Sequence, residues 1–228
     1  MFEKIDVYDI VTSLLHGTLF IFALLYFFPD MVGIFVFVDY EVPRFQFPDS
    51  ILLLIFMSLA FFWGQTIMAL SSYFQWFLFL TWGGKPSDKV FSGSFPQKYL
   101  SDDLIKLAKE KLQSSFATPC SDSALFSKAK CIARKAEGSL SERHNQMYAY
   151  NRIAFLNILA ISIIFLCSCY FGICEWIPMW CRCVLGIIFF LLLCIHWYRA
   201  KQRAFYYVSE VIIVAERELS GENRGVRN

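Results

Sequence analysis

The chain has 228 residues, of which 57% are hydrophobic and only 18% are charged, and its mean hydropathy is +0.49. Soluble domains carry about 45–50% apolar and about 25% charged residues, so this composition excludes a disordered chain, a collagen and an ordinary soluble enzyme. The net charge of +2 hides a strong sorting by segment, which is typical of multi-pass membrane proteins.

Residues 1–82 are predicted to form a first transmembrane hairpin. The uncharged run 10–28 is long enough to cross a hydrocarbon core of about 30 Å. Residues 30–49 are predicted to form a short outer loop, because Pro43 and Pro48 prevent a long helix. A second uncharged run, 50–82, then stops at Gly-Gly-Lys-Pro, as helices do.

The second run is longer than a bilayer requires, at about 50 Å if it is fully helical. Its helix is therefore expected to tilt, to kink at Gly64 or to project beyond the membrane.

Residues 83–138 are predicted to form a basic helical loop. Over residues 83–152, twelve Lys and Arg stand against seven Asp and Glu, so the net charge is 12 − 7 = +5. Two amphipathic helices are expected, at 102–116 and 123–136, the first with an apolar face of Leu104, Leu107, Ala108 and Leu112. This loop is too short for an independent core. It is expected to pack on the membrane helices, on a second copy of the chain, or on a partner.

Residues 139–198 are predicted to form a second transmembrane hairpin. Ser139 to Glu142 match the S-x-x-E capping box, so a helix is expected to start there and to continue into a third span at 153–173. A short turn leads to a fourth span at 177–198. Residues 199–228 are predicted to be a helix followed by a polar tail, anchored at the inner membrane surface by Arg199, Lys201 and Arg203.

The predicted fold class is therefore an all-α integral membrane protein with four transmembrane helices. The positive-inside rule places the 83–138 loop between spans two and three, and the C-terminal extension, in the cytoplasm. We expect a multi-pass protein of the cell inner membrane with both termini cytoplasmic.

A stripe of small and polar residues recurs at helical spacing in the second span. Such residues either let helices approach closely, which favours oligomer formation, or line a water-filled pore. The sequence leaves both open for Gly64, Gln65, Ser71, Ser72 and Gln75.

A second set of polar residues precedes the third span. His144, Tyr148 and Arg152 are spaced i, i+4 and i+8, with Asn151 beside them. Arg152 either extends to the lipid headgroups, or it belongs to a point that couples the loop to the membrane. Both interpretations remain open at this stage.

The chain has eight cysteines. Cys174 and Cys181 flank the predicted outer turn, where an oxidising environment would favour a disulfide or close approach. Cys167, Cys169, Cys181 and Cys183 resemble a zinc pattern, but most of them lie in predicted membrane helices, where cysteine acts as a small apolar residue. No metal and no cofactor are therefore expected.

Catalytic motifs are absent from the sequence. There is no H-E-x-x-H, G-x-S-x-G or P-loop pattern and no pair of carboxylates within a predicted span. We therefore expect a protein that is not an enzyme and has no catalytic residues.

Three stretches carry a resemblance: YDIVTSLLHG at 8–17, WGQTIMALSSYF and WGGKPS within 63–87, and HNQMYAYNR at 144–152. They resemble small four-span inner-membrane proteins of bacterial anti-phage defence operons, of the Kiwa type or the retron membrane-effector type. The resemblance implies an effector or sensor that forms a homo-oligomer in the lipid bilayer and responds to a cytosolic protein or nucleoprotein partner. The chain itself is not expected to read a nucleic-acid sequence.

The leading hypothesis is thus a membrane-embedded defence effector or sensor, with permeabilisation of the membrane as one outcome. The alternatives are a passive anchor that recruits a soluble partner, and a small channel or transporter subunit.

Overall fold

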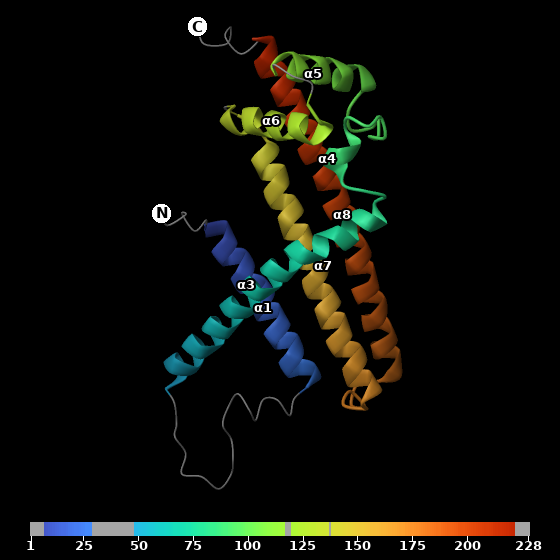
Figure 1. The fold of residues 1–228 in the computed structure, drawn as a ribbon. Helices are drawn as coiled ribbons and strands as arrows, with labels where there is room; N and C mark the ends of the chain where they lie inside the picture. The colour runs from blue at the N-terminus through green and yellow to red at the C-terminus, as the bar shows by residue number, and fades with distance from the viewer. Residues whose placement is uncertain (1–6, 29–47, 117–119, 137, 222–228) are drawn as a thin grey trace. The chain divides into compact units, whose positions relative to one another are not determined.

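The structure, a computed structural model, describes residues 7–28, 48–116, 120–136 and 138–221 (Figure 1). Within these ranges every regular element is a helix. Most of the predicted outer loop and the tail after residue 221 lie outside the described residues. The helices are α1 Val7–Phe27, α3 Asp49–Thr81, α4 Pro86–Lys89, α5 Asp102–Ser114, α6 Asp122–Lys135, α7 Ser141–Tyr170 and α8 Met179–Ser220.

Four of these helices, α1, α3, α7 and α8, are long and apolar enough to cross a membrane. This confirms the prediction of an all-helical chain with four candidate spans. Large apolar side chains point outward from them, among them Phe62, Leu166 and Phe190, which are 70%, 62% and 64% exposed. Apolar surface of this extent is typical of a membrane-facing region.

The chain divides into two compact units. The first, which we call the apolar unit, contains Met1–Phe74 and Arg152–Trp197, and the second, the amphipathic unit, contains Gln75–Asn151 and Tyr198–Asn228. Three helices contribute residues to both units, because α3, α7 and α8 each continue through the point at which the division falls.

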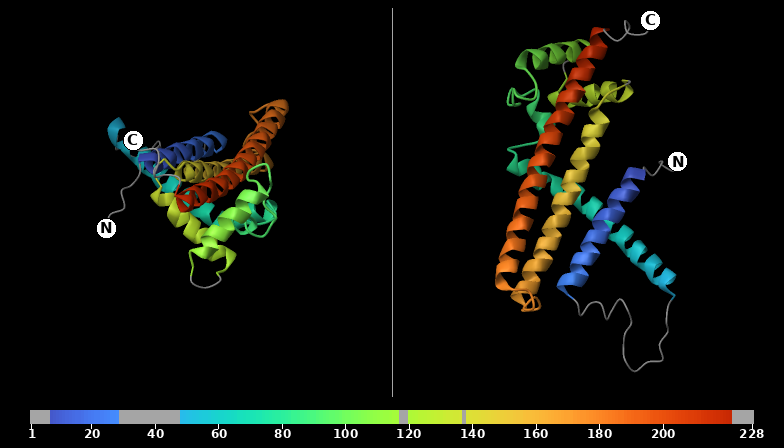
Figure 2. Two further views of the ribbon diagram at one scale, coloured as in Figure 1. Left: turned by 90° about the horizontal axis from the view of Figure 1, so that it is seen from above. Right: turned by 180° about the vertical axis from the view of Figure 1, so that it is seen from behind.

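In the apolar unit, α1 crosses α3, and α7 and α8 run side by side in opposite directions (Figure 2). The turn between α7 and α8 depends on Gly172, whose φ of +72° few other residues adopt. Phe27, Phe165 and Cys174 are buried together beside this turn, with Ile161 and Ile177.

In the amphipathic unit, α5 and α6 pack across the second half of α8 (Figure 1). Leu112 of α5, Leu125 of α6 and Ile212 of α8 are all fully buried in one hydrophobic core. The sequence left open what the basic loop packs against. The structure shows that residues 198–220 of the same chain complete its core.

The buried face of α5 differs from the predicted one. Ile105, Ala108 and Leu112 are buried, whereas Leu107 is 44% exposed. Residues at i, i+3 and i+7 share one side of a helix, and Leu107 lies off that side, so its inclusion in the predicted face was wrong.

The start of α7 also differs from the predicted capping box. The helix begins at Ser141, and the Leu140 carbonyl accepts its first turn's hydrogen bond from the His144 amide at 3.0 Å. The Leu140 amide donates to Glu210 Oε1 of α8 at 3.2 Å. A carboxylate from a distant helix, rather than Glu142, thus satisfies the exposed amide before this helix.

Candidate functional site

Two glycines allow α1 and α3 to approach until their backbones touch. A Cβ atom at Gly64 would lie 1.9 Å from the Ser13 carbonyl oxygen, and one at Gly17 would lie 1.7 Å from the Ala60 carbonyl oxygen. Real side chains never come this close. Only glycine therefore permits this crossing, as at other small-residue contacts between membrane helices.

Polar side chains are buried around the crossing. Gln65 Nε2 donates a hydrogen bond to Ser13 Oγ at 2.8 Å. Asn157 of α7, 1% exposed, donates through Nδ2 to the His16 carbonyl oxygen at 3.1 Å. These hydrogen bonds connect α1 to α3 and to α7. They fix the positions of the three helices along one another within an apolar environment.

Most residues of the predicted small and polar stripe on α3 make contacts within the same chain. Gly64 and Gln65 contact α1, Ser71 is fully buried and donates to the Met68 carbonyl oxygen, and Ser72 Oγ accepts from Arg152 Nη2 at 3.3 Å. Gln75 belongs to the amphipathic unit, where it lines a cavity. Gly64, Gln65 and Ser72 thus contact neighbouring helices, while a role of the stripe in assembly or in a pore stays a prediction.

The four residues of the predicted coupling point belong to two different units. Along α7 the division between the two units falls between Asn151 and Arg152. His144 Nδ1 lies 3.4 Å from Arg203 Nη1, and Tyr148 is buried with its ring 6.3 Å from that of Trp82.

Asn151 Nδ2 donates to the Met147 carbonyl oxygen in its own helix at 2.7 Å. The sequence therefore identified residues on both sides of the division, and whether they couple the units stays a prediction.

Arg199 and Arg203, two of the predicted anchors in α8, contact other side chains. Arg199 lies 3.5 Å from the Gln202 side-chain oxygen, and Arg203 contacts His144. Lys201 is half-buried. Their role at a membrane surface stays a prediction.

All eight cysteines lie in the described residues and are free thiols. Cys174 is fully buried and lies 3.0 Å from Ser168 Oγ, and Cys181 packs against the same cluster. Both cysteines therefore belong to the surroundings of this turn as free thiols, and their pairing or crosslinking stays a prediction. Among the described residues, His, Cys, Asp and Glu form no group of three that would hold a metal ion.

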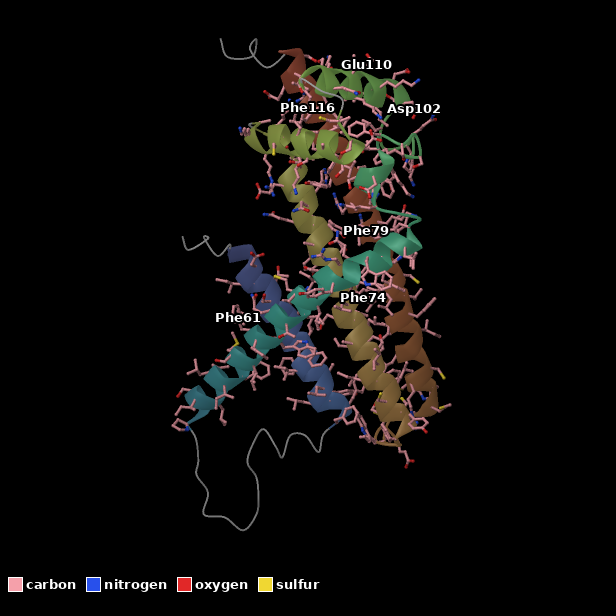
Figure 3. All side chains as sticks on the ribbon, viewed as in Figure 1. Phe61, Phe74, Phe79, Asp102, Glu110 and Phe116 are labelled. Carbon is pink, nitrogen blue, oxygen red and sulfur yellow. The ribbon has the colours of Figure 1, made fainter. Side chains whose placement is uncertain are left out.

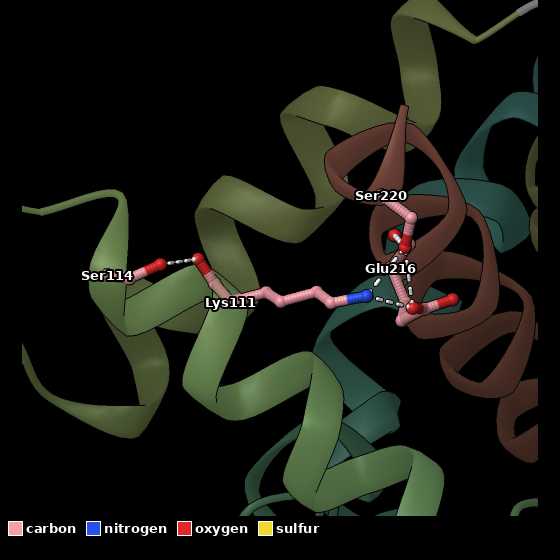
Figure 4. A network of polar contacts seen from close by, with 4 residues as sticks. All are labelled: Lys111, Ser114, Glu216 and Ser220. Atoms are coloured by element: carbon pink, nitrogen blue, oxygen red, sulfur yellow. Dashed lines mark hydrogen bonds and ion pairs between the residues drawn. The ribbon is translucent and has the colours of Figure 1, made fainter. Parts of the chain in front are cut away.

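An ion pair connects α5 to the end of α8 (Figure 4). Lys111 Nζ lies 2.5 Å from Glu216 Oε1 and 2.6 Å from Ser220 Oγ. Hydrogen bonds from Lys111 and then from Ser220 lower the pKa of the Glu216 carboxyl. This network fixes α5 against the helix that completes its core.

The amphipathic unit also contains a cavity of about 380 Å³, lined by residues of α3, α4, α6, α7 and α8. Its lining residues include the basic Lys85 and Lys130 and the apolar Phe126 and Val208. Phe79, labelled in Figure 3, also lines it, from the last turns of α3. Tyr207 also lines the cavity, and burial raises the pKa of its hydroxyl above the ordinary value for tyrosine.

Sequence analysis missed Ser13, Asn157 and Glu216. The first two carried a readable signal, because a polar side chain in an uncharged run is costly unless another helix satisfies it. Glu216 carried none, since its partner lies 105 residues away in the sequence.

No family model, curated protein or solved structure matches this chain.

Proposed function

We propose that this protein is a membrane-embedded effector or sensor, in which the amphipathic unit receives a signal and the candidate spans respond. The observation that carries the proposal is the continuity of α7 and α8. Each is a single helix that supplies residues to both units. An unbroken helix transmits a displacement, whereas a flexible linker would absorb it.

The composition of α7 supports this continuity. Residues 141–170 contain no glycine and no proline, which are the residues that most often break or bend a helix. The part of α7 around Tyr150 and Arg152, where the division between the units falls, therefore contains no helix-breaking residue.

The cellular setting of the proposal comes from the resemblance of three stretches to membrane proteins of anti-phage operons. In that setting the chain is a homo-oligomer of the bacterial inner membrane with both termini in the cytoplasm, and the amphipathic unit contacts a cytosolic protein or nucleoprotein. The positive charge of residues 83–152 supports the cytoplasmic placement.

The competing function is a passive anchor, in which the spans only retain the amphipathic unit at the membrane. The two functions differ in what they require of α7. An anchor tolerates a flexible α7, whereas a sensor does not.

The test compares two variants of α7 that keep its register. Ala149→Gly with Tyr150→Gly introduces two helix-destabilising residues, each costing about 1 kcal/mol relative to alanine. Tyr150→Ala alone removes the same ring and keeps the helix. Phage protection and membrane depolarisation are measured in cells that carry the natural gene neighbourhood, with protein abundance as the reference.

We expect the glycine pair to lose about tenfold or more of the protection that Tyr150→Ala retains, at equal abundance. Full protection and unchanged depolarisation by the glycine pair would favour the passive anchor.

A further inference from the structure

The cavity of the amphipathic unit has the size and the lining of a ligand site. Its volume is about 380 Å³, and sites for small molecules generally measure about 300–1,000 Å³. Helices α4, α6, α7 and α8 all contribute walls, together with the last turns of α3.

The charge of the lining favours an anion. Lys85 and Lys130 line the cavity against one carboxylate, Asp88, so the net charge is 2 − 1 = +1. Among the described residues neither lysine has an ion-pair partner, because the two recorded salt bridges use Lys109 and Lys111. Two amines without a partner carboxylate are typical of a site that takes its negative charge from a ligand.

Residues with neutral hydrogen-bond donors also line the cavity. They are Ser127, Asn145 and Tyr207. A smaller neighbouring cavity of about 140 Å³ shares Lys130, Asn145 and Tyr207 with it, and adds one cation, Arg134, and one carboxylate, Glu142. A group with several acceptor oxygens, such as a phosphate, would use these donors together.

The remaining wall is apolar. Phe79, Phe126 and Val208 line the same cavity. Phe79 lies three residues before Trp82, at which the uncharged run of α3 ends. Uncharged runs generally end near the lipid headgroups, and we expect Phe79 and the cavity to lie at that level.

We propose that this cavity binds the phosphate of an anionic amphiphile, with Lys85 and Lys130 as the cationic contacts and the apolar wall receiving the adjoining hydrocarbon. An anionic phospholipid supplies both parts. A soluble organic phosphate supplies the same anion without the hydrocarbon, and the experiment separates the two sources. The inference concerns ligand binding and does not depend on the proposed role in defence.

The experiment uses the full chain purified in a neutral detergent. Binding of phosphatidylglycerol and of phosphatidylcholine is measured by native mass spectrometry for the wild type and for Lys85→Gln with Lys130→Gln. The matched control is Lys106→Gln with Lys135→Gln, which removes the same charge from exposed positions that do not line the cavity.

We expect the wild type to prefer phosphatidylglycerol, the cavity variant to lose about tenfold in affinity, and the control to bind as the wild type does. Glycerol 3-phosphate is added as a competitor. If it binds as tightly as phosphatidylglycerol and with the same dependence on the two lysines, the phosphate site stands and its ligand is soluble.

A second variant keeps every charge. Ser127→Phe places a ring in the cavity from an exposed position of α6, and we expect it to abolish binding while the thermal unfolding temperature stays unchanged. The proposal is overturned if phosphatidylglycerol and phosphatidylcholine bind equally. Binding that survives both the lysine pair and Ser127→Phe would overturn it as well.

Discussion

Gly64 of α3 lies so close to Ser13 of α1 that a methyl group at position 64 would sit 1.9 Å from the Ser13 carbonyl oxygen. Helices that cross at this distance gain dispersion contacts along both backbones, which is the main attraction available between helices in lipid. The crossing therefore depends on the absence of a side chain at position 64. Adding one methyl group there tests it.

Gly64→Ala is expected to destabilise the apolar unit by about 1–3 kcal/mol, because the two backbones must separate to admit the methyl group. The matched control is Gly186→Ala in α8, where the new Cβ would lie 4.0 Å from its nearest recorded neighbour, a carbon of the Phe165 ring. Thermal unfolding in detergent, followed by tryptophan fluorescence, compares the two. Equal unfolding temperatures would show that the helices do not cross as described.

The hydrogen bond from Gln65 to Ser13 predicts a measurable coupling between these residues. In a double-mutant cycle of Gln65→Leu and Ser13→Ala, we expect a coupling free energy of about 0.6 kcal/mol, with an upper value of about 1.7 kcal/mol. Thr66→Val serves as the control, because the Thr66 hydroxyl donates to the Phe62 carbonyl oxygen of its own helix. Its effect should simply add to that of Ser13→Ala.

Glu216 predicts a pH dependence of the amphipathic unit. Its pKa in the folded state is lowered, chiefly by the hydrogen bond from Lys111. Its contribution to stability is therefore complete above the unfolded pKa of about 4.3 and is lost as the pH falls through the lower folded value. Glu216→Gln should reduce the free energy of unfolding by about 1 kcal/mol at pH 7.

This difference should disappear in acid below the folded pKa, where the wild-type carboxyl is protonated too. Urea unfolding in detergent at both pH values measures it. Glu110→Gln, at an exposed position of α5 next to Lys111 (Figure 3), should leave stability unchanged at both pH values. A difference for Glu216→Gln that persists unchanged in acid would contradict the role of the ion pair.

The shared core of the amphipathic unit predicts that α8 holds the basic loop in place. Ile212 is fully buried against α5 and α6, and Ile212→Ala is expected to cost about 2–5 kcal/mol. Limited proteolysis should then cut residues 90–135 faster. Leu107→Ala, which truncates a side chain that is 44% exposed, should leave the cleavage rate close to that of the wild type.

The proposed topology predicts opposite labelling of two cysteine probes. On a cysteine-free background, an impermeant thiol reagent added outside cells should label Glu175→Cys in the turn between α7 and α8, and should not label Lys106→Cys in α5. Both positions are exposed, so access is decided by the membrane. Labelling of Lys106→Cys alone would invert the proposed orientation.

Local features of the sequence were sufficient to predict the long helices, although not the short α4. Uncharged runs of the required length predicted α1 and α3 to within three residues at each end, and Gly83 and Gly84, with φ of +76° and +124°, end α3 at the predicted place. A helix is formed by hydrogen bonds between residues four apart, and its ends by the residues beside them, so these features are readable from a short window.

Tertiary structure alone decided which residues meet. The partner of the basic loop is residues 198–220, the cap before α7 is Glu210, and the partner of Lys111 is Glu216. Each of these contacts joins residues about 70 or more positions apart in the chain. The periodicity of a helix shows that one of its faces is apolar, but it does not show which other segment covers that face.

The same division applies to the candidate site. The stripe on α3 was visible in the sequence because polar residues stand out in an apolar run, whereas its contact with Ser13 required the crossing of two helices. The cavity was not visible at all, because Lys85, Lys130 and Tyr207 come from three distant segments of the chain and no local pattern joins them. Residue type and spacing thus determined the helices of this protein, and only packing determined its sites, because a site is made by side chains that the fold brings together.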